Sequence, residues 1–194
     1  MSTSERPTIL RRAPESYSAA SKWLHWLTAA CIFFLIPSGI SLEHLPEGVI
    51  QNTFYDLHRS FGFVVLCLAI LRVGVRLYYG APAAYAGLTP FERIASQAAH
   101  MALYVLIFVT PMLGWAATSA YPVTVSVFWL FNLPMIAPAN EDLFKTLILG
   151  HKIAAFTMAG VLAAHIGGAL MHGFIKRDGV LARMLPDGFM QPRN

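Results

Sequence analysis

The sequence predicts an all-α integral membrane protein, a bundle of four helices that cross the bilayer. Of its 194 residues, 56% are hydrophobic and 12% are charged, whereas soluble domains have roughly a quarter charged residues. The mean hydropathy of +0.56 points the same way. Four segments have the ~20 mostly apolar residues that a spanning helix needs. We therefore expect a single transmembrane domain over residues 1–194.

The expected spans cover residues 23–42, 57–79, 98–119 and 147–175. The fourth is longer than a bilayer requires, so its ends must tilt or emerge. Pro37 and Pro111 lie inside the first and third spans, where a proline predicts a kink. The apolar patch VSVFWLF, within the connection 120–146, is too short to span. We expect it to lie along the outer surface.

The distribution of lysine and arginine predicts the orientation, because cytoplasmic flanks carry the excess. Three cations, Arg59, Lys145 and Lys152, fall on one side of the expected membrane. Eleven fall on the other side: Arg6, Arg11, Arg12, Lys22, Arg72, Arg76, Arg93, Lys176, Arg177, Arg183 and Arg193. Both termini are therefore expected in the cytoplasm, at what we call the inner side. Lipid is the expected surrounding, and no nucleic-acid partner is expected.

The fourth span carries histidines in an informative spacing. His151 and His165 are fourteen residues apart, which on a helix returns to within about 40° of the same direction after a rise of ~21 Å. The two side chains should share one face at two depths. His58, at the outer start of the second span, matches the depth of His151. His25, at the inner start of the first span, approximately matches that of His165.

Two facing pairs of histidines at two heights in a helix bundle are typical of two stacked haems with two histidine ligands each. Neutral imidazole is a good axial ligand for haem iron. The sequence has no CxxCH motif, so the haems would be bound non-covalently, as haem b. Spacing alone leaves two alternatives open. One is a histidine relay that transports protons or metal ions, and the other is structural packing of buried histidines.

The remaining histidines and two arginines are further candidates. Arg72 lies fourteen residues after His58, at the inner level, and Arg76 follows one turn later. Both could bind the propionates of an inner haem, or they could simply follow the positive-inside rule. His100 and His172 are expected near the inner surface. One further histidine, His44, lies in a loop, where we expect it to be solvated.

Four stretches together resemble the bacterial cytochrome b561 family. They are SKWLHWLTA at 21–29, LHRSFGFVVLCLAILRVGVRL at 57–77, HMALYVLIFVTPMLGW at 100–115 and HKIAAFTMAGVLAAHIGGALMHGFIKRDGVLARMLP at 151–186. The resemblance covers about residues 17–188 and is weakest over 120–145. It implies a four-helix bundle of the bacterial inner membrane with two haems b. His25 and His165 would be the axial ligands of the inner haem iron, and His58 and His151 those of the outer one. An alternative pairing uses His100 at the inner haem.

The resemblance also implies a function. The length and motif order are similar to those of superoxide oxidases, which pass electrons from periplasmic superoxide to membrane ubiquinone. Here His100 and His172 are candidates for the quinone site, and Arg59, Lys145 and Lys152 could steer the superoxide anion. No catalytic residue is assigned. Two other classes stay open: an electron-transfer subunit docked on a dehydrogenase or another redox partner, and a histidine-lined transporter without haem.

Overall fold

Four long helices make up the part of the chain that the structure, a computed structural model, describes, residues 16–186. They are α1 (Ala19–Ser41), α2 (Val49–Tyr79), α3 (Pro90–Ala120) and α4 (Glu141–Leu170). All four are long and apolar enough to cross a membrane, so the predicted all-α, four-span fold is confirmed. Three helices, α2, α3 and α4, begin six to eight residues before the expected spans. Their first residues mix polar and apolar side chains, so they lack the continuous apolar run by which a span is recognised.

Local capping sets the early starts of α3 and α4. Pro90 occupies the first turn of α3, and the preceding Thr89 forms a capping box with Glu92. In it, the Thr89 hydroxyl accepts from the Glu92 N–H, and the Glu92 carboxylate accepts from the Thr89 N–H. At α4, the Asn140 side chain accepts a hydrogen bond from the Leu143 N–H at 2.8 Å. Each cap satisfies backbone donors that a helix start leaves unpaired.

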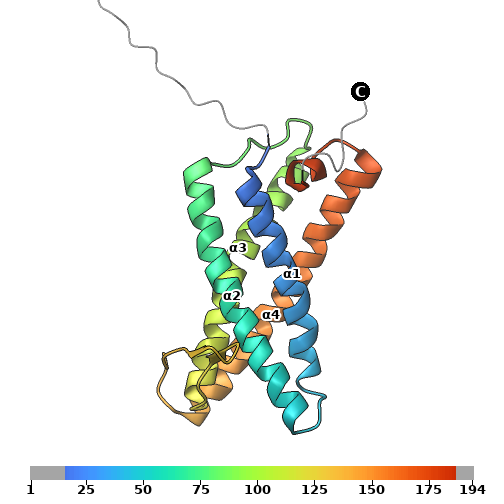
Figure 1. Cartoon of the computed structure of the whole chain (residues 1–194). Coiled ribbons are helices and arrows are strands. Elements are labelled where there is room, and N and C mark those ends of the chain that lie inside the picture. Colours follow the sequence, from blue (N-terminus) through green and yellow to red (C-terminus); the bar gives the residue numbers. More distant parts are fainter. Residues whose placement is uncertain (1–15, 187–194) are drawn as a thin grey trace, which may run out of the picture.

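The bundle has two distinct ends (Figure 1). At one end lie the starts of α1 and α3, the ends of α2 and α4, and the chain that follows α4 as far as residue 186. We call it the inner end, after the orientation expected from the sequence. The opposite end, with residues 42–48 and the connection from α3 to α4, is called the outer end. Which end faces the cytoplasm stays a prediction. Four of the arginines behind that prediction lie outside the described residues: Arg6, Arg11, Arg12 and Arg193.

The four helices pack as two pairs. α1 lies mainly against α2, and α3 mainly against α4, whereas α4 makes few close backbone approaches to α1 or α2. A small apolar core joins the pairs at mid-height, formed by Ile32, Val65, Ala69, Ile107 and Met158. Many large apolar side chains outside this core are exposed, among them Phe33, Leu77 and Phe156. Such a surface suits surrounding lipid rather than water.

The chain turns back at the inner end after α4. The helix continues as a π-helix, Met171–Lys176, and ends at Arg177, whose φ is +52°. A short 3₁₀-helix, Leu181–Met184, then lies across the inner end. There the Trp26 indole N–H donates to the Met184 carbonyl at 3.0 Å, and Arg183 donates to the Ala83 carbonyl at 2.9 Å. The segment after the fourth span is thereby tied to α1 and to the loop between α2 and α3.

The apolar patch in the connection 120–146 forms a β-hairpin at the outer end. β1 (Ser126–Val127) pairs antiparallel with β2 (Phe131–Asn132), and β1 packs against α2. Val127 is buried, whereas Leu130 at the tip is 80% exposed. The expected surface segment is therefore anchored on one face and apolar on the other.

Candidate functional site

The structure brings the four predicted ligand histidines together as two pairs across the bundle. The ring centroids of His58 on α2 and His151 on α4 are 6.1 Å apart. Those of His25 on α1 and His165 on α4 are 6.2 Å apart. An imidazole nitrogen binds a first-row metal at about 2 Å and lies about 1 Å from its ring centre, so two ligands on opposite sides of one metal have centroids about 6 Å apart. Both separations match that requirement.

Hydrogen bonds fix the tautomers of the outer pair. The Nδ1 of His151 lies 2.9 Å from the Thr110 carbonyl, which can only accept, so Nδ1 carries the proton. The Ser38 hydroxyl gives its proton to the Leu35 carbonyl at 3.0 Å. Its oxygen also lies 3.0 Å from the Nδ1 of His58 and accepts from it when Nδ1 carries the proton, as it must in a neutral ring that binds a metal through Nε2. Both imidazoles keep an unprotonated Nε2, the atom that can bind iron, with Nδ1 held as metal-binding histidines usually require.

Two glycines fit closely against the same rings. A Cβ on Gly39 would lie 3.0 Å from Cε1 of His58, and a Cβ on Gly114 would lie 3.0 Å from Nδ1 of His151. Real Cβ atoms essentially never come closer than this. Each outer histidine ring thus packs closely against a glycine, that of His58 against Gly39 on α1 and that of His151 against Gly114 on α3. Sequence reasoning did not find Ser38, Thr110 or these glycines, although Pro-Ser-Gly at 37–39 and the Thr-Pro pair at 110–111 mark both places.

The inner level holds three histidines instead of two. The ring of His165 lies 6.2 Å from that of His25 and 5.1 Å from that of His100. The shorter distance is less than two ligands on opposite sides of a metal require, so His25 fits the role of axial partner better. The side chain of His100 is exposed and its ring lies edge-on to that of His165. The alternative pairing through His100 is therefore the poorer fit.

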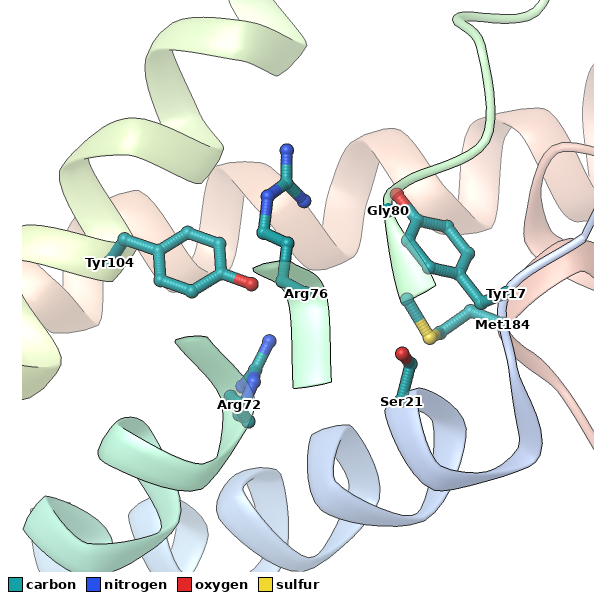
Figure 2. A pocket seen from close by; sticks show the side chains of 7 residues that line it. All are labelled: Tyr17, Ser21, Arg72, Arg76, Gly80, Tyr104 and Met184. Carbon is teal, nitrogen blue, oxygen red and sulfur yellow. The ribbon is translucent and has the colours of Figure 1, made fainter. Parts of the chain in front are cut away.

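Arg72 and Arg76 meet at the inner pocket that Figure 2 shows. Both guanidinium groups lie over the ring of Tyr104, at 5.5 and 5.6 Å from its centroid, and Arg72 donates a long 3.4 Å hydrogen bond to Nδ1 of His25. Within residues 16–186 neither arginine has a carboxylate partner. Two unpaired cations beside the inner histidines suit an anionic group, such as the carboxylates of haem.

His172 lies at the inner end, as expected, and is paired with a carboxylate. Its side chain is buried within the π-helix, and its Nδ1 is 2.6 Å from an Asp178 carboxylate oxygen. A second Asp178 oxygen accepts from the Val180 N–H at 3.1 Å. His172 is therefore buried and hydrogen-bonded within residues 16–186. Asp178 was missed from the sequence because a single aspartate in a basic tail carries no spacing signal.

The outer cations expected to attract an anion are all paired with carboxylates. Arg59 lies 3.7 Å from Asp56, and Lys145 lies 2.7 Å from Glu141. Lys152 forms an ion pair and hydrogen bond with Glu43, which lowers the pKa of the Glu43 carboxyl group below its ordinary value. The positive potential expected at the outer end is consequently weaker than the cations alone suggest.

Taken together, the residues fit haem as a bound group. The donor chemistry is neutral imidazole in pairs of suitable separation, with unprotonated Nε2 atoms at the outer level and free cations at the inner level. In the part of the chain that the structure describes, no cluster of three or more His, Cys, Asp or Glu side chains is arranged to hold a bare metal ion.

Comparison with known proteins agrees with this site. The sequence model of prokaryotic cytochrome b561 matches residues 16–187. Cytochrome b561 homolog 2 of Escherichia coli is 30% identical over 183 residues, covering 89% of this chain and 92% of that protein. The probable superoxide oxidase CybB of Yersinia pestis is 27% identical (89% and 97% covered), and cytochrome b562 of Cereibacter sphaeroides is 26% identical (87% and 94%). The chain therefore belongs to the prokaryotic cytochrome b561 family, multi-pass electron-transfer proteins of the bacterial inner membrane that carry haem b.

Proposed function

We propose that this protein is a di-haem cytochrome that takes electrons from superoxide at the outer end and delivers them to ubiquinone near the inner end. The observation that supports it best is the presence of two histidine pairs of equal separation at two levels, His58 with His151 and His25 with His165. Two haems b held by these four histidines would supply reversible one-electron transfer.

The chain's own residues have clear tasks in this proposal. α4 contributes one histidine to each level and fixes their separation through a rise of ~21 Å. Ser38 and Thr110 hold the outer rings in the tautomer that leaves Nε2 free. Met158, midway between His151 and His165, belongs to the apolar core, which keeps water out of the region between the two levels.

The reaction balances with two superoxide anions for each quinone. Each superoxide loses one electron and leaves as dioxygen, and ubiquinone takes up both electrons and two protons. His100 is exposed and in ring contact with His165, so it is placed to hydrogen-bond a quinone carbonyl or to donate a proton. The His172–Asp178 pair is the second candidate source of protons at this end. The name of the Yersinia pestis relative supports superoxide as the electron donor.

One observation favours a second donor. The outer end has three cations against five carboxylates in the described residues, namely Glu43, Glu47, Asp56, Glu141 and Asp142. Such a surface attracts a basic redox protein better than it attracts a small anion. An electron-transfer role with a basic periplasmic donor is therefore the second candidate.

The two donors predict opposite responses to one substitution. Glu43→Gln removes the carboxylate that neutralises Lys152 and should speed quinone reduction by superoxide several-fold at low ionic strength. With a basic donor protein it should slow electron entry. Glu47→Gln is the matched control, because Glu47 lies in the same loop and has no described ion pair. The assay follows quinol formation by purified protein supplied with superoxide. Quinol formation no faster than without the protein would refute the superoxide proposal.

A further inference from the structure

We propose that hydrogen-bond acceptors at the outer level and free cations at the inner level make the bundle electrically asymmetric. Ser38 and Thr110 lower the reduction potential of a haem held by the outer pair, and Arg72 and Arg76 raise that of a haem held by the inner pair. Electrons then move downhill from the outer end to the inner end. The inference rests on the proposed binding of two haems, and it adds the residues that set the two potentials and thereby drive electrons in the proposed direction.

At the outer level, both ligand rings donate their Nδ1 protons to acceptors. His58 donates to the Ser38 hydroxyl at 3.0 Å, and His151 donates to the Thr110 carbonyl at 2.9 Å. Such bonds make the imidazole a stronger electron donor to its metal. A stronger donor stabilises ferric relative to ferrous iron, so the potential falls.

At the inner level, neither ligand ring has such an acceptor among the described contacts, and a cation takes its place. A neutral imidazole that binds iron through Nε2 keeps its proton on Nδ1, so His25 could then no longer accept from Arg72. The Arg72 and Arg76 guanidinium groups would remain beside the pair as cations without a carboxylate partner within residues 16–186. Ferrous iron has one positive charge fewer than ferric iron. Nearby cations therefore favour the reduced state, with little screening in an apolar bundle.

The other charges at each end act in the same direction. In the described residues, the outer end has three cations and five carboxylates. The described part of the inner end has two carboxylates, Glu92 and Asp178, and five cations besides Arg72 and Arg76: Lys22, Arg93, Lys176, Arg177 and Arg183. The two carboxylates of haem itself would be present at both levels, so they cancel in the comparison. The charges farther from the histidine pairs thus shift the two potentials in the same directions as the groups in contact with the rings.

The test is a spectroelectrochemical titration of the purified haem-loaded protein, without superoxide or quinone. We expect two components. Arg72→Gln and Arg76→Gln should each lower the potential of the higher component. At a fixed applied potential, the ferrous-to-ferric ratio of that component should fall on the order of tenfold. This is the effect of a unit charge at ~10 Å in a medium of effective permittivity ~20. Ser38→Ala should raise the lower component. Arg93→Gln is the control, because it removes a charge from the same end but outside the pocket. It should change both potentials much less.

Conservative variants separate charge from folding. Arg72→Lys keeps the cation and should keep the potential, whereas a merely structural role of the guanidinium would not be rescued. If Arg72→Gln loses haem altogether, Arg76→Gln, whose side chain is exposed, provides the measurement. Two components that coincide, or that do not respond to the arginine and serine variants, would overturn the inference while leaving the di-haem proposal intact. A preparation that binds fewer than two haems would instead refute the proposed function.

Discussion

At the residue scale, the outer histidines depend on side chains that are small or absent. Gly114 on α3 faces the ring of His151, and the Thr110 carbonyl one turn earlier accepts the Nδ1 proton of the same ring. Pro111 lies between them and removes one backbone hydrogen bond from this part of α3. Gly114 and the Thr110 carbonyl therefore fix the position and the tautomer of the His151 ring together.

Gly114→Ala should displace the ring of His151. The added methyl group would lie 3.0 Å from Nδ1 of His151, so the ring must shift and its hydrogen bond to Thr110 must lengthen. Overpacking of this kind costs about 1–3 kcal/mol, and outer haem affinity should fall on the order of tenfold or more. Gly160→Ala on α4 is the control, because a Cβ there meets nothing within 4 Å. Haem titration of the apoprotein, followed in the visible spectrum, measures the difference. Equal affinities in both variants would show that the close fit is irrelevant.

Sequence spacing predicted which histidines meet but not what holds them. The fourteen-residue interval between His151 and His165 needs only helix geometry, so it could be derived without a structure. The contacts of His58 with Ser38, and of His151 with Thr110, depend on how α1 and α3 are rotated against their neighbours. Those rotations come from packing between helices and have no local signature.

At the scale of the element, the β-hairpin is held by tertiary contacts rather than by its own sequence. Phe128 and Trp129 have φ values of +46° and +59°, a region that costs bulky residues of order 1–3 kcal/mol each. The buried Ser60 hydroxyl compensates by accepting from the Phe128 N–H at 2.8 Å. The Trp129 indole N–H donates to Asp56 at 3.2 Å. Both anchors lie within two residues of His58 on α2, so the hairpin and the outer ligand are coupled.

Ser60→Ala should release the hairpin. The variant leaves the Phe128 N–H without its acceptor, and an unsatisfied buried donor costs about 1–3 kcal/mol. Hydrogen exchange of the amides in residues 125–133 should accelerate accordingly, while exchange at the core of α3 stays unchanged. Ser96→Ala is the control, since the Ser96 hydroxyl bonds only its local Arg93 carbonyl among the described contacts. Unchanged exchange in the hairpin would mean that Ser60 does not anchor it.

The same dependence explains why the sequence did not predict a hairpin. VSVFWLF has no Asn-Gly or Gly-rich turn signal, which is the usual sign of a tight hairpin. Its bulky turn residues adopt positive φ only because α2 supplies acceptors. By contrast, the local sequence marks the start of α3, through Thr89-Pro90 and Glu92. The early start of α3 was therefore detectable from the sequence, and the hairpin was not.

At the scale of the whole molecule, the histidines link two helix pairs that otherwise touch mainly at mid-height. α4 approaches α1 and α2 closely at few points, yet it contributes the ring opposite His25 and the ring opposite His58. A bound haem at each level would therefore join the two pairs above and below the apolar core. The cofactor and the fold would stabilise each other, since a group that binds only the folded state shifts the folding equilibrium.

The most direct test of two haems held by two histidine pairs is the haem content of the purified protein. It is measured by the pyridine haemochrome method together with the dithionite-reduced minus oxidised spectrum. The account predicts two b-type haems per chain, half that number in His151→Ala, and an unchanged number in His44→Ala, whose side chain is exposed in a loop. A well-folded protein without haem, or a His151→Ala variant that keeps the full number, would contradict it.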